Sequence, residues 1–153
     1  MPLLQLIVLA LLSSLAPAQS RPAQAGQVPA ATKITVYKDP DCGCCDSWVE
    51  HLRKHGFEVA VRDTNDLSGV KRAGRVPERL QTCHTAFVNG YVVEGHVPAA
   101  DIRRMLDEKP RIAGIGVAGM PAGSPGMETG GRADKYDVIA FNRDGTTRVF
   151  SRH

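Results

Sequence analysis

Four cysteines are the residues of this 153-residue chain whose type and spacing could do chemistry. Cys42, Cys44 and Cys45 fall within four positions, and only Cys83 is distant. Thiolates bind soft metal ions, exchange disulfides and form structural cross-links. Because this distribution allows one long-range bridge at most, it disfavours two simple structural disulfides. Metal binding, disulfide exchange and a structural cross-link remain the alternatives.

The cysteine cluster lies between a predicted strand and a predicted helix. Residues 33–37 alternate in a β-rich pattern, and residues 45–55 carry apolar side chains at helical spacing before Gly56. The first turn of a helix offers unpaired N–H groups and a partial positive charge, which lower the pKa of nearby thiols. Thiolate is the form that attacks disulfides and also the form that binds metals. The position before a helix therefore does not distinguish disulfide exchange from metal binding.

The remaining patterns predict one domain. Strands are expected over 57–62, 85–88 and 91–94, and helices within 63–74 (begun by Thr64 or Asn65), 76–80 and 97–108. Asn89-Gly90 predicts a tight hairpin between the second pair of strands. The order strand, helix, strand, helix, hairpin, helix is that of a thioredoxin-like domain with a CxxC before its first helix. We therefore predict an α/β fold with a thioredoxin-like mixed sheet and flanking helices.

The two ends of the chain differ from this central pattern. The predicted domain spans 33–153, and its part from about residue 110 is a C-terminal extension. This extension contains a Gly/Pro/Met loop over 114–131 and a β-hairpin formed by 136–141 and 146–150. At the other end, the apolar run 3–15 and the small residues after it predict a signal peptide, residues 1–18, cleaved after Ala18 or alternatively after Ala25. Residues 19–32, rich in Ala, Gln and Pro, are expected to be a flexible spacer. The product is expected to be exported, with no stable membrane association after cleavage.

The charge pattern excludes one class of partner. The net charge is +3, from 19 basic and 16 acidic residues, and the basic residues are scattered along the chain. Nucleic-acid binding requires a basic stripe or patch, commonly with aromatic side chains, and the sequence has neither. We therefore expect no nucleic-acid partner.

Three stretches resemble a known family. Residues 36–48, 83–98 and 119–128, which include the cysteine cluster, the Cys83-His84 pair and a Gly-Met-Pro segment, are similar to the CopG-like family of small exported copper-binding proteins. One departure is Ala118, where proline is expected. The resemblance implies a periplasmic, thioredoxin-like protein that binds copper through its cysteines, as a multi-copper cluster, in copper resistance. It also suggests a change of copper oxidation state. The implied ligands are Cys42, Cys44, Cys45 and Cys83.

Further side chains are candidates for the same site. Sulfur ligands favour Cu(I), and three thiolates in one loop can bridge more than one ion. His84 occupies the position where thioredoxin relatives place a cis-proline, and it is predicted to be a ligand or to orient a sulfur. Met120 and Met127 are either ligands or apolar plugs of their loop.

Other residues are assigned ordinary structural roles. We expect His96 to be a structural loop residue, and His51 and His55 to lie on an exposed helix face. Zinc is the less favoured metal, because structural zinc sites use two separated ligand pairs, whereas these cysteines divide three and one.

The sequence thus predicts a periplasmic protein that sequesters Cu(I), with copper ions and other copper-handling periplasmic proteins as its partners. Two alternatives stay open. One is a thiol–disulfide oxidoreductase of thioredoxin type, and the other is a disulfide-stapled structural or partner-binding domain. No catalytic residue is predicted, and an enzymatic role would be that of an oxidoreductase acting on copper or thiols.

Overall fold

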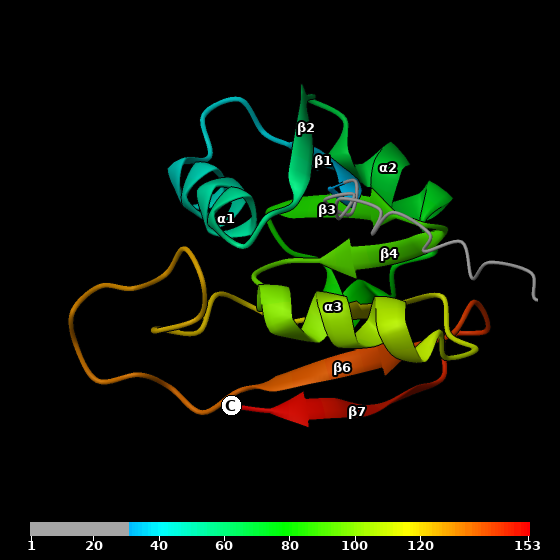
Figure 1. Ribbon diagram of the computed structural model, residues 1–153. Coiled ribbons are helices and arrows are strands. Elements are labelled where there is room, and N and C mark those ends of the chain that lie inside the picture. Colours follow the sequence, from blue (N-terminus) through cyan, green and yellow to red (C-terminus); the bar gives the residue numbers. More distant parts are fainter. Residues whose placement is uncertain (1–30) are drawn as a thin grey trace, which may run out of the picture.

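A computed structural model describes residues 31–153 of the chain. The predicted signal peptide and residues 19–30 of the predicted spacer lie outside the described residues. The elements, in chain order, are β1 (Lys33–Lys38), α1 (Gly43–Lys54), β2 (Glu58–Asp63), α2 (Leu67–Ala73), a 3₁₀ turn η1 (Glu78–Leu80), β3 (His84–Val88), β4 (Tyr91–Glu94), α3 (Ala99–Glu108), β5 (Gly114–Gly116), β6 (Asp137–Phe141) and β7 (Thr147–Arg152) (Figure 1). Within the described part, no helix has both the length and the apolar character needed to cross a membrane.

All seven strands form a single mixed sheet in the order β2-β1-β3-β4-β5-β6-β7. The pairs β1–β2 and β4–β5 are parallel, and the other four are antiparallel. The predicted α/β class and the order of elements up to α3 are confirmed. The predicted C-terminal hairpin is β6–β7, and it extends the same sheet at the edge opposite β2 (Figure 1).

Alternating strand residues supply apolar groups to both faces of this sheet, as the two-residue period of a strand requires. On β3, Ala86 and Val88 belong to the main core, whereas Phe87 packs with a second cluster. α1 and α3 cover the main core with Trp48, Leu52 and other apolar side chains: Val49, Ile102 and Met105. The second cluster contains Val76, Leu80, Val92 and Phe141. The site described below therefore rests on a sheet that is packed on both faces.

Strand β5 corrects the sequence prediction, which assigned residues 114–131 entirely to a loop. Gly114, Ile115 and Gly116 form a three-residue strand between β4 and β6. A Cβ on Gly114 would lie 2.1 Å from the Val92 carbonyl oxygen, so the close approach of the strands requires glycine there. Two glycines in three residues carry no apolar alternation, which explains why the pattern predicted a loop.

Candidate metal centre

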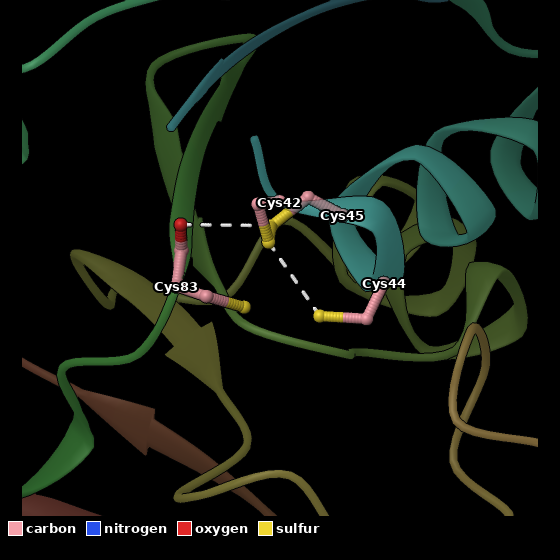
Figure 2. A group of neighbouring side chains, drawn as sticks. All are labelled: Cys42, Cys44, Cys45 and Cys83. Carbon is pink, nitrogen blue, oxygen red and sulfur yellow. Dashed lines mark hydrogen bonds between the residues drawn. A yellow bond between two sulfur atoms is a disulfide. The ribbon is translucent and has the colours of Figure 1, made fainter. Parts of the chain in front are cut away.

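The sheet topology brings the distant cysteine to the cluster. β1 and β3 are antiparallel neighbours, with Lys38 at the end of β1 opposite His84 at the start of β3. The loop after β1 therefore meets the residue before β3, which is Cys83. The four sulfur atoms all lie within 4.8 Å of one another. Figure 2 shows the side chain of Cys83, just before β3, pointing toward the three cysteines at the beginning of α1.

A buried lysine holds the loop that carries the cluster. Lys38, whose side chain is 5% exposed, donates from Nζ to the carbonyl oxygens of Asp39 at 3.0 Å and Pro40 at 3.3 Å. The same ammonium lies 3.1 Å from Asp46 in the first turn of α1 and 3.2 Å from Asp63 on β2. One cation thus ties together β1, the cysteine loop and the start of α1.

α1 begins at Gly43, two residues earlier than predicted. Cys42 is its N-cap and makes no side-chain cap hydrogen bond, so the helix lacks the usual Ser, Thr or Asp signal at its start. Cys44 and Cys45 consequently sit in the first helical turn, where the helix leaves its backbone N–H groups unpaired.

In the structure the cysteines are in two chemical states. Cys42 and Cys45 form a disulfide, and Cys44 and Cys83 are free. The Sγ of Cys44 lies 3.5 Å from that of Cys42, and the disulfide sulfur of Cys45 lies 3.6 Å from the carbonyl oxygen of Cys83. In this form only two sulfurs can become thiolate ligands, whereas reduction of the disulfide supplies all four.

Two histidines lie close to the sulfur of Cys83. The Nδ1 of His84 and the Nε2 of His96 each lie 3.4 Å from it. The other ring nitrogens donate to backbone carbonyls, His84 Nε2 to Gly95 at 3.0 Å and His96 Nδ1 to Pro125 at 2.8 Å. These bonds fix the neutral tautomers in which the nitrogens facing the sulfur carry free lone pairs. Cys83, His84 and His96 thus form a second possible metal-binding group that shares its sulfur with the first.

Burial sets the proton content of this second group. Burial, together with the neighbouring Cys44, raises the pKa of the Cys83 thiol to about 12. Burial likewise lowers the pKa of His84 to about 3, with His96 contributing, and it also lowers the pKa of His96. At neutral pH the metal-free group is therefore one thiol and two neutral imidazoles. A metal ion that binds here must displace the thiol proton, and it finds both imidazoles ready as donors.

His96 is the residue that sequence reasoning missed. It was expected to serve only in its loop, but it is fully buried and lies against Cys83. The expectation of an exposed helix face is confirmed for His55 but is wrong for His51, which is half-buried and whose Nε2 accepts from the backbone N–H of Ala99 at 3.1 Å. His96 was missed because the Gly-His-Val-Pro sequence that contains it gives no local signal of its contact with Cys83 across the fold.

The loop between β5 and β6 closes over the start of α1, as Figure 1 shows for the segment that arches below this helix. Gly126 packs so tightly that a Cβ would lie 2.8 Å from the backbone nitrogen of Trp48 and 2.9 Å from the carbonyl oxygen of Cys44. Met127, half-buried, follows it directly. Met120 is 54% exposed and lines a surface depression with Tyr136. Met127 is thus adjacent to the segment that touches the cysteine helix. For both methionines the two predicted roles, ligand or apolar plug of the loop, stay open.

Comparisons with known proteins gave matches in both sequence and fold. A family model described as "Protein of unknown function, DUF411" matches residues 80–127. Two solved structures, "Copper resistance protein copG- Form 1" and "Form 2", are each 44% identical in sequence, with TM-scores of 0.76 and 0.77. Each alignment covers 80% of this chain and 98% of the other. The search of curated proteins gave no match.

Proposed function

The chain belongs to the family of the copper resistance protein CopG, and on that premise we propose that it is a periplasmic copper-binding protein that sequesters Cu(I) in copper resistance. The observation that carries the proposal is the sharing of the Cys83 sulfur between two donor groups, the four cysteines and the Cys83-His84-His96 set. A thiolate can bridge metal ions, and soft sulfur with imidazole nitrogen suits Cu(I). The arrangement supports a multinuclear thiolate cluster.

The two states of the cysteines add a redox element to this function. A Cys42–Cys45 disulfide offers no thiolate, so the disulfide and a Cu(I) ion bound by both sulfurs exclude each other. Reduction of the disulfide therefore accompanies full loading. We extend the proposal to an interconversion of copper oxidation states at this site, in which the Cys42 and Cys45 thiols give one electron each to two Cu(II) ions, leaving two Cu(I) ions, one disulfide and two released protons. Other copper-handling periplasmic proteins would be the exchange partners.

Copper counting on purified protein lacking residues 1–18 tests the function. The fully reduced protein should bind more than one Cu(I) per chain, and Cys44→Ser should lower that number because Cys44 belongs to the thiolate set. Ser47→Ala, which removes only an exposed hydroxyl one turn along α1, serves as the matched control. Copper is measured by elemental analysis, with thiols counted on the same sample, after equilibration with a chromogenic Cu(I) chelator.

Three results would contradict the proposal or part of it. Full copper loading of Cys44→Ser would show that the Cys44 thiol is not a copper ligand. Zinc retained in preference to Cu(I) would favour a structural zinc site. Oxidised protein that loads as much Cu(I) as reduced protein would refute the exclusion between disulfide and metal.

The thiol–disulfide oxidoreductase remains a second candidate, because the Cys42–Cys45 disulfide lies at the start of α1 as such chemistry requires. Efficient reduction of a test disulfide by the reduced, copper-free protein would favour it over copper sequestration. Export is tested separately by determining the N-terminus of the protein recovered from the periplasm, which we expect at residue 19 or residue 26.

A further inference from the structure

A buried ion pair lies directly behind the Cys83-His84 segment. Lys71 on α2 and Glu94 on β4 approach to 2.6 Å between Nζ and Oε1, and their side chains are 7% and 0% exposed. Withdrawing two charges from water is costly, and mutual attraction offsets that cost only when further hydrogen bonds satisfy both groups. A buried pair is for that reason poor evidence of a purely stabilising role, and its other bonds indicate what it does.

Glu94 accepts hydrogen bonds from the two residues that flank the candidate ligands Cys83 and His84 in the sequence. Its Oε1 accepts from the backbone N–H of Thr82 at 2.7 Å, and its Oε2 accepts from the hydroxyl of Thr85 at 2.6 Å. Thr82 immediately precedes Cys83, and Thr85 immediately follows His84. Lys71 completes the arrangement, since its Nζ also donates to the Thr85 hydroxyl at 3.0 Å.

The backbone of the same segment is fastened to the next strand. Thr85 pairs with Glu94 in the β3–β4 register, and the Gly95 N–H donates to the carbonyl oxygen of His84 at 3.2 Å. A Cβ on Gly95 would lie 2.7 Å from the Thr82 hydroxyl, so the two segments are in close contact. Among the residues that the structure describes, Glu94 belongs to neither of the two donor groups, and the protonated ammonium of Lys71 has no lone pair to offer a metal. Their effect on the site must pass through the residues that they hold.

We propose that Lys71 and Glu94 are a positioning pair, which fixes residues 82–85 so that the Cys83 sulfur and the His84 Nδ1 point at the same metal ion. The inference rests on the proposed copper function for its metal-binding consequence. Outer residues that orient ligands are worth about 10–100-fold in metal affinity when removed. The pair is predicted to set affinity without changing the number of donors.

Glu94→Gln tests the pair, because it keeps the shape of the side chain but removes the charge that holds Lys71. We expect the Cu(I) affinity of the reduced protein, measured by chelator competition, to fall about 10–100-fold with the copper count unchanged. The control is Asp101→Asn, which alters another buried carboxylate, bonded to Ser151 and His153 instead of the cysteine site. It should lower the unfolding midpoint but leave the affinity at the wild-type value.

A milder variant and a metal-free measurement complete the test. Thr85→Val removes a single hydroxyl and should lower the affinity less than Glu94→Gln, while Thr85→Ser should restore it. In copper-free protein, the ¹⁵N resonances of the His84 ring should shift in Glu94→Gln and stay in place in Asp101→Asn.

The outcomes separate the inference from the function. Wild-type affinity in both Glu94→Gln and Thr85→Val, or an equal loss in Asp101→Asn, overturns the positioning role. If Glu94→Gln does not fold, Thr85→Val and Thr85→Ser decide. If the wild type binds no Cu(I), the proposed function fails, and the ring resonances of His84 still decide whether the pair positions the segment.

Discussion

Replacing Gly126 by alanine tests whether the loop between β5 and β6 is built against the cysteine helix. Gly126 has a φ of +85°, and its Cβ would lie 2.8 Å from the Trp48 nitrogen and 2.9 Å from the Cys44 carbonyl oxygen. Real Cβ atoms do not approach so closely, and the atoms it meets are helix backbone, which cannot turn aside. The loop itself must move.

The expected magnitude has two parts that can be separated. A left-handed backbone costs an alanine about 1–2 kcal/mol, and crowding in a packed region costs about 1–3 kcal/mol more. Gly130 provides the matched control, since its φ is +76° and a Cβ there meets nothing within 4 Å. Gly130→Ala should therefore lose only the backbone part of the free energy of unfolding. Urea denaturation of both variants measures the difference, about 1–3 kcal/mol in favour of Gly130→Ala.

The displaced loop should also disturb the site. Pro125 precedes Gly126, and its carbonyl oxygen accepts from His96 Nδ1 at 2.8 Å. A shift of the loop weakens this bond, which fixes the tautomer of His96, so Cu(I) affinity should fall in Gly126→Ala and not in Gly130→Ala. Equal stability and equal affinity in the two variants would refute the packing of this loop against α1 and its part in the site.

Two further outcomes test the buried groups around the cluster. Because burial lowers the pKa of His84 from 6.5 to about 3, the unfolded chain binds the proton first as pH falls. The contribution of neutral His84 to the free energy of unfolding is fully present above pH 6.5. Below pH 6.5 that free energy should fall by up to about 1.4 kcal/mol per pH unit. Urea unfolding of copper-free protein at several pH values should show that His84→Gln flattens this slope, and an unchanged slope would contradict the burial argument. Lys38→Met should lower the free energy of unfolding, measured by thermal denaturation, by about 1–2 kcal/mol, because it leaves two carbonyl oxygens without their charged donor. Lys33→Met, which breaks only the exposed pair with Glu58, should cost little, and similar losses in both variants would argue against the anchoring role of Lys38.

The parts of the fold that depend on local sequence were predictable. Apolar periodicity located α1 and α3, and Asn89-Gly90 located the β3–β4 turn, because these signals arise from neighbours in the chain. The start of α2 shows the limit of such signals. Thr64 or Asn65 was expected to begin it, but Asp66 is the N-cap, with its Oδ1 accepting from the Gly69 N–H at 2.9 Å. Three candidate cap residues in a row leave the choice to the geometry of the turn.

The site divides in the same way between local and distant contacts. The cluster at Cys42–Cys45 could be predicted because its spacing and its place before a helix are visible in one segment. The contribution of His96 could not, since it depends on β4 carrying residue 96 back past Cys83 and on the Pro125 carbonyl selecting its tautomer. These contacts join segments 13 and 29 residues apart, which no periodicity records.

Cys83 is the residue at which the local and distant parts meet. Its thiol is partly buried and its pKa is raised to about 12, so the free protein does not hold a thiolate there at neutral pH. A metal ion must supply the positive charge that makes ionisation favourable, and two neutral imidazoles complete its surroundings without adding charge. Metal binding and loss of the Cys83 proton are therefore coupled, and the shared sulfur of Cys83 joins the two donor groups.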